Sequence, residues 1–123
     1  MSITNLSRLN NSDLVERFRA LAIEKSKVLL DSNTAAANRI YDRMEEIDQE
    51  LRRRGSDARK ALLVLLDDRD RRVRFEAAQK SLAVAPQKAL ETIKQIAASH
   101  FMPLAGEAGM ALEFLADGIF KPD

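Results

Sequence analysis

The chain has no cysteine or tryptophan, and it has only one histidine and one tyrosine. The absence of cysteine excludes disulfide bonds and thiolate chemistry, and it fits a reducing cytoplasm. A single histidine without cysteine also excludes the usual soft-ligand sites for zinc and other transition metals within one chain. We therefore expect no cofactor and no metal centre, and we do not expect an enzyme.

Neither sign of charge dominates, because the chain has 20 Lys and Arg residues and 19 Asp and Glu residues, which gives a net charge of +1. The whole chain therefore has no field that favours nucleic acid or an anionic membrane. The longest run without Asp, Glu, Lys or Arg has 12 residues, 95–106, too few to span a bilayer. The first residues lack the apolar core of a signal peptide, and Ser2 stands where myristoylation requires glycine. We expect a cytoplasmic protein without a membrane partner.

Apolar residues recur at helical spacing, and no segment alternates with a period of two, so we predict an all-α fold. Residues 1–11 are polar and are expected to form a flexible lead-in. Residues 12–123 are expected to form a single domain. Ser12 or Asp13 can cap the first helix, and Asp13 with Glu16 has the spacing of a capping box.

The first two helices are expected before and after a polar break at residues 31–33. The first carries an apolar stripe of Leu14, Phe18, Leu21, Val28 and Leu29. The second, over residues 34–54, has the strongest periodicity in the chain, with Ala37, Ile40, Met44, Ile47 and Leu51. Gly55 follows as a residue able to adopt a positive φ and end this helix.

Residues 62–82 form the central stretch of the sequence, and they predict two short antiparallel helices. The stripe of the first is Leu62, Leu65 and Leu66, and that of the second is Val73, Ala77 and Leu82. Asp70 is a plausible N-cap of the second. Two further helices are expected, one from Pro86 to about residue 99 and one from Pro103 to the pair Asp117-Gly118. Ile119 and Phe120 are expected to fold back as an apolar cover.

The central stretch resembles a HEAT repeat, in which leucines are followed by Asp, a Val-Arg pair, small residues and a final Leu. Here these are Asp70, Val73-Arg74, Ala77-Ala78 and Leu82. Residues 86–115 resemble a degenerate second copy, and the first two helices would form a third pair. The resemblance implies a short HEAT-like α-solenoid of about six helices in three antiparallel hairpins. Such solenoids are mostly binding scaffolds.

Over nearly its full length the chain also resembles a small family of bacterial HEAT-like domains of unknown function. That family has no known active site, so the resemblance assigns no functional residue.

Four sets of residues have both a structural and a functional interpretation. His100 is expected in a loop or helix cap rather than a catalytic site. Residues 67–70 are acidic like a calcium loop but lack its Gly and terminal Glu, so a turn with a cap is favoured. Gly106 and Gly109 are expected to allow close packing against a neighbouring helix rather than to bind a ligand. Arg74 is expected to tie the turn between helices through Asp68 or Asp70 rather than to contact a ligand.

The charge distribution is uneven in one segment, residues 52–74, which contains nine basic residues and four acidic ones. This segment is either an ordinary solvated surface or a patch for an acidic protein or a phosphate backbone. The candidate partner-binding residues are Arg52, Arg53, Arg54, Arg69, Arg71 and Arg72. We expect a non-catalytic protein–protein interaction module with an unknown protein partner. The alternative is a nucleic-acid-binding HEAT-like domain that uses the same arginines.

Overall fold

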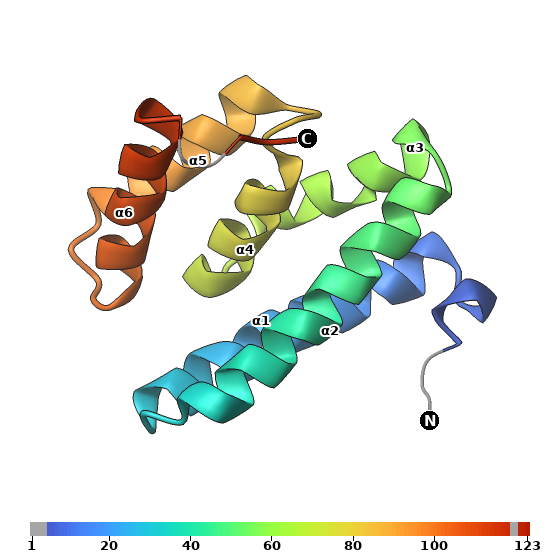
Figure 1. Ribbon diagram of the computed structural model, residues 1–123, viewed down its shortest axis with the longest axis horizontal. Coiled ribbons are helices and arrows are strands. Elements are labelled where there is room, and N and C mark those ends of the chain that lie inside the picture. The colour runs from blue at the N-terminus through green and yellow to red at the C-terminus, as the bar shows by residue number, and fades with distance from the viewer. Residues whose placement is uncertain (1–4, 119–120) are drawn as a thin grey trace. The chain divides into compact units, whose positions relative to one another are not determined.

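The structure, a computed structural model, describes residues 5–118 and 121–123 (Figure 1). These residues contain helices and turns and no strand, so the predicted all-α fold is confirmed. The helices in chain order are η1 Leu6–Arg8, α1 Asn11–Leu30, α2 Thr34–Arg53, α3 Ser56–Arg59, η2 Lys60–Asp67, α4 Arg71–Ser81, α5 Pro86–Ala97 and α6 Leu104–Ala116, where η marks a 3₁₀-helix.

The chain divides into two compact units, an N-terminal unit that ends at Leu62 and a C-terminal unit that begins at Leu63. In the N-terminal unit α1 and α2 pack side by side as an antiparallel hairpin (Figure 1). All five residues of the predicted α2 stripe are buried. In α1, Leu14 and Phe18 are buried as expected, but Ala22 completes the core and Leu21 stays partly exposed.

The described part of the N-terminal unit begins with a short helix. Part of the expected lead-in forms the 3₁₀-helix η1, and α1 begins at Asn11. The cap of α1 is Asn10, whose side chain accepts a 2.8 Å hydrogen bond from the backbone N–H of Asp13. The predicted caps Ser12 and Asp13 are therefore wrong. A short polar side chain caps the helix, as expected, but this residue lies two or three positions before the predicted ones.

The turns around α2 follow the prediction. Asn33 caps the helix by accepting a 3.1 Å hydrogen bond from the N–H of Ala36. At the other end Gly55 has a φ of 111°, a conformation that a residue with a Cβ rarely adopts.

The predicted helix that carries Leu62, Leu65 and Leu66 differs from a regular α-helix. Only Ser56–Arg59 is α-helical, and Lys60–Asp67 forms the 3₁₀-helix η2. A 3₁₀-helix has three residues per turn, so Leu62 and Leu65 lie on one side of it. Both are buried together with Leu66, which lies about 120° further round a 3₁₀-helix, so more than one side of η2 is buried.

In the C-terminal unit α4 packs against α5, and α5 packs against α6. Asp70 caps α4 as predicted, accepting a 3.0 Å hydrogen bond from the N–H of Val73. Pro86 occupies the first turn of α5, where its missing N–H costs no hydrogen bond. The buried apolar residues of α4, α5 and α6 form the core of this unit: Val73, Phe75, Ala77, Ala78, Ala89, Ile93, Ile96, Leu104, Ala105 and Ala108.

Among the described residues neither glycine of α6 packs closely against a neighbouring helix, so that prediction is wrong. A Cβ added at Gly106 would come within 3.0 Å of the Cε atom of Met102, a flexible side chain in the preceding turn. A Cβ at Gly109 would meet nothing within 4 Å in the described part of the chain. The expected cover by Ile119 and Phe120 lies outside the described residues.

Candidate functional site

The three candidate arginines at the end of α2 all pair with acidic residues of the same helix. Arg52 contacts Asp48, with 3.0 Å between Nε and Oδ2. Arg53 donates to both oxygens of Glu50, including a 3.1 Å bond from Nε. Arg54 donates from Nε to Glu50 over 2.8 Å. These pairs have the i,i+3 and i,i+4 spacing at which side chains of one helix meet.

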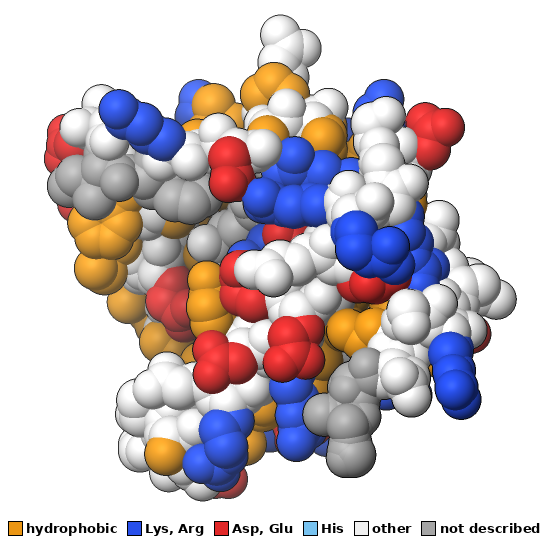
Figure 2. Space-filling model, turned by 45° about the vertical axis from the view of Figure 1, so that its right-hand side comes forward, with side chains coloured by type: hydrophobic (Ala, Val, Ile, Leu, Met, Phe, Trp, Pro, Cys, Tyr) orange, Lys and Arg blue, Asp and Glu red, His pale blue; other side chains and the backbone are white. Residues whose placement is uncertain are grey.

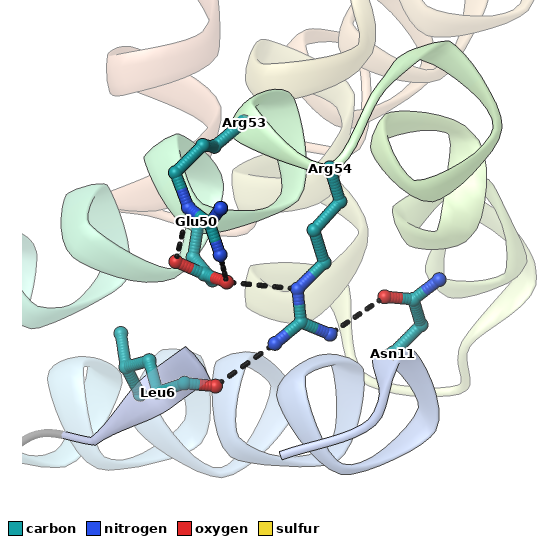
Figure 3. A network of polar contacts seen from close by, with 5 residues as sticks. All are labelled: Leu6, Asn11, Glu50, Arg53 and Arg54. Carbon is teal, nitrogen blue, oxygen red and sulfur yellow. Dashed lines mark hydrogen bonds and ion pairs between the residues drawn. The ribbon is translucent and has the colours of Figure 1, made fainter. Parts of the chain in front are cut away.

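Arg54 also joins α2 to the beginning of the chain (Figure 3). One terminal nitrogen donates to the side-chain oxygen of Asn11 over 2.9 Å, and the other donates to the backbone carbonyl of Leu6 over 2.9 Å. The planar guanidinium thus holds η1 and the start of α1 against the end of α2. This is a structural clamp built from a residue expected to bind a partner.

The clamp changes the acidity of its central carboxylate. The hydrogen bonds from Arg53, and next those from Arg54, lower the pKa of Glu50 from 4.5 to about 2. Glu50 is therefore ionised at neutral pH and keeps both arginines engaged.

A groove of about 420 Å³ lies beside this clamp and is lined by residues of η1, α1 and α2. Leu6 of η1 lines it, and α1 and α2 supply its two sides. The lining residues are Leu6, Arg17, Ala20, Leu21, Arg43, Glu46 and Ile47. The groove was not predicted, because Leu6 belonged to the expected lead-in.

The other three candidate arginines lie in the C-terminal unit and differ from one another. Arg69 is exposed. Arg71 is exposed with its guanidinium over the ring of Phe101, 3.6 Å from the ring centre, a cation–π contact. Arg72 is only 4% exposed and donates two 2.8 Å hydrogen bonds to the carboxylate of Glu107.

Arg72 is thus part of the interior of its unit rather than of a surface patch. Its terminal nitrogen also lies 3.3 Å from Glu76, which is buried as well. Burial by itself lowers the pKa of Arg72, but the bonds to Glu107 and the charge of Glu76 raise the pKa above its ordinary value. A buried, doubly paired cation offers a partner little surface.

Arg74 ties the turn before α4, but it does so through a backbone oxygen rather than through an acidic side chain. Its guanidinium donates a 2.6 Å hydrogen bond to the backbone carbonyl of Asp68. The Asp68 carboxylate in turn accepts a 2.9 Å bond from the N–H of Asp70. These contacts give residues 67–70 the turn-and-cap role.

Large apolar side chains remain exposed along α6 and the turn before it. Met102 is 71% exposed, Met110 is 55% exposed and Phe114 is 39% exposed. Met110 and Phe114 are four residues apart, and Met102 lies over Gly106, which is four residues before Met110. Residues with this spacing share one face of a helix. We call Met102, Met110 and Phe114 the α6 apolar face.

The remaining surface carries both charges. Figure 2 shows Lys and Arg side chains with Asp and Glu side chains among them on the face in view. His100 is exposed in the turn after α5 and has a φ of 64°. Among the described residues no helix is both long and apolar enough to cross a membrane.

Two comparisons with known proteins found relatives. A sequence profile described as a domain of unknown function, DUF2019, matches residues 12–116. The crystal structure of the protein RPA1889 from Rhodopseudomonas palustris CGA009 is similar, with 40% sequence identity and a TM-score of 0.91. The match covers 98% of this chain and 100% of that chain. No curated protein matches. Neither description names an activity or a ligand.

Proposed function

Because the chain belongs to the DUF2019 family, whose domain has no known function, we propose its function from its own surface: it is a non-catalytic module that binds another protein. The predicted resemblance to a family of unknown function is confirmed by the same match. The HEAT-like stacking of three hairpins remains part of the proposal.

The observation that supports this proposal is the α6 apolar face. A helix normally buries its apolar side, yet two methionines and a phenylalanine of this helix and its preceding turn are exposed. Contiguous exposed apolar side chains mark interaction surfaces, and methionine adapts its shape to different partners.

The alternative, nucleic-acid binding through residues 52–74, has weaker support. Phosphate recognition needs several free cations on one surface. Arg52, Arg53 and Arg54 already pair with carboxylates, and Arg72 is buried against two glutamates. Of the six candidates, Arg53, Arg69 and Arg71 are exposed, and Arg53 already pairs with Glu50.

The proposed absence of catalysis and the proposed cytoplasmic location rest on composition. The one histidine lies in an exposed turn, and the chain has no cysteine to serve as a nucleophile. A protein without cysteine is compatible with a reducing compartment.

The test is affinity capture from a lysate of the native host with three forms of the protein. One is the wild type, one carries Met110→Glu and Phe114→Glu, and the matched control carries Leu30→Glu. Leu30 is 74% exposed and lies at the end of α1, so its substitution adds an exposed charge elsewhere. We expect the wild type and the control to retain the same protein and the double variant to lose it.

Capture that is equal for all three forms would contradict a role for the α6 apolar face. Retention on heparin separates the two partner classes. Steep loss of retention with salt, abolished by charge reversal of Arg69 and Arg71, would favour nucleic acid. Weak retention that these changes leave unaltered would favour a protein partner.

A further inference from the structure

The groove of the N-terminal unit has an apolar floor and a charged rim. Leu6, Leu21 and Ile47 supply its branched hydrocarbon surface, and Ile47 is itself buried. Arg17 of α1 and Arg43 of α2 flank the groove from opposite helices, with Glu46 beside them. A ligand in this groove would meet hydrocarbon and guanidinium groups together.

The two arginines are available for a ligand. Both are exposed, and neither forms a hydrogen bond or an ion pair with any described residue. This sets them apart from Arg52, Arg53 and Arg54, each of which already pairs with a carboxylate. An unpaired guanidinium keeps the planar fork of donors that matches a carboxylate.

One wall of the groove is fixed before any ligand arrives. The carbonyl of Leu6 accepts a hydrogen bond from Arg54, and Arg54 is itself held by Glu50 and Asn11 (Figure 3). Leu6 is therefore positioned by contacts that do not involve the groove. A preformed wall lowers the ordering cost of binding.

We propose that this groove binds a small apolar monoanion, a free carboxylic acid with a compact hydrocarbon body. Two arginines and one glutamate give the rim a net charge of +1, which a single carboxylate neutralises. A dianionic phosphate would leave an uncompensated charge beside Glu46. The volume of about 420 Å³ falls in the range of small-molecule sites, roughly 300–1,000 Å³.

The dimensions favour a free small acid over a peptide. The lining residues span 17–21 on α1 and 43–47 on α2, about one turn of each helix. A docked amphipathic helix needs anchors over two or more turns. The proposal is independent of the α6 apolar face, which belongs to the other unit.

The experiment titrates the full-length protein with octanoate and follows the backbone amide resonances by NMR. Octanol and octylammonium, with the same chain and a neutral or positive head group, are the matched ligands. We expect octanoate to shift resonances of residues 17–21 and 43–47 saturably. We expect octanol to bind more weakly and octylammonium not to bind there.

Four variants test the named residues, and a fifth serves as the control. Arg17→Gln and Arg43→Gln should each weaken octanoate binding about threefold, and the double variant about tenfold, because an exposed ion pair contributes modestly. Ala20→Trp should abolish binding, because the indole fills the groove from an exposed position without removing core contacts. Arg69→Gln, an exposed arginine of the C-terminal unit, is the control and should bind as the wild type does. Circular dichroism confirms that each variant is folded.

Equal binding of octanoate and octylammonium would overturn the proposal. So would shifts that map outside the groove, no saturation at millimolar octanoate, or an equal loss in Arg69→Gln. Binding of an acidic peptide at these residues without binding of octanoate would overturn the assignment of a free small acid.

Discussion

Arg72 of α4 and Glu107 of α6 form a two-pronged ion pair, with both guanidinium–carboxylate distances at 2.8 Å. The residues are 35 positions apart, and the contact links the first and last helices of the C-terminal unit. Arg72 is buried, whereas the Glu107 side chain is 36% exposed. Arg72 therefore has a structural role, although it lies in the basic segment of residues 52–74.

Loss of this pair should destabilise the C-terminal unit. Glu107→Gln keeps the shape but removes the charge, and we expect a cost of about 2 kcal/mol, typical of a charged hydrogen bond. Arg72→Met should cost about 3 kcal/mol, because Glu76 then stays buried without this cation. Urea unfolding measures both. Glu113→Gln, an exposed change on the same helix, is the control, and a Glu107→Gln result equal to it would show that the pair contributes nothing.

Leu66 should be a core residue despite lying in a 3₁₀-helix. It is 3% exposed, so we expect Leu66→Ala to cost about 2–5 kcal/mol. Val64, two residues earlier and 66% exposed, supplies the control Val64→Ala, which should change stability little. Thermal unfolding compares the two. Equal melting temperatures for both variants would be incompatible with the described burial.

Gly109→Ala should stabilise the protein. Gly109 lies inside α6 without a positive φ, and the added Cβ would meet no described atom within 4 Å. The gain should be about 0.5–1 kcal/mol, the difference in helix propensity between Ala and Gly. Gly106→Ala should gain less, because its Cβ must displace the end of Met102. A destabilised Gly109→Ala protein would instead support close packing at this position.

The clamp at Glu50 should make stability depend on acid pH. Its pKa is about 2 in the folded protein and 4.5 in the reference state, so its contribution is complete above pH 4.5. The contribution is lost as the pH falls from 4.5 towards 2. Because Arg53 is largely exposed, we expect on the order of 1 kcal/mol. The measurement is the stability difference between wild type and Glu50→Gln across this range, with Glu46→Gln as the control. A difference that does not shrink with acidity would refute the clamp.

Local features of the fold could be predicted from the sequence. The α2 stripe, the Asp70 cap, the Pro86 helix start and the positive φ of Gly55 all depend on residues within a turn or two of one another. The type of helix at residues 60–67 could not be predicted. Leu62, Leu65 and Leu66 have the i, i+3, i+4 spacing typical of an α-helix, so their pattern indicated the wrong kind of helix.

The candidate site was harder to predict from the sequence, because its contacts join residues that lie far apart in the chain. Arg54 lies 48 positions from Leu6, and no local spacing indicates that contact. The number of basic residues in positions 52–74 identified a segment rich in arginine. It could not distinguish the buried Arg72 from the exposed Arg69. The unpaired arginines of the groove, Arg17 and Arg43, lie outside that segment.

The central claim, a protein-binding role for the α6 apolar face, is tested most directly by photo-crosslinking in the native host. A photoreactive phenylalanine analogue replaces Phe114 in one form and Leu30 in the control form. We predict one discrete protein adduct from position 114 and none from position 30. Identical adducts from both positions, no adduct from either, or an adduct to nucleic acid at position 114 would contradict the account.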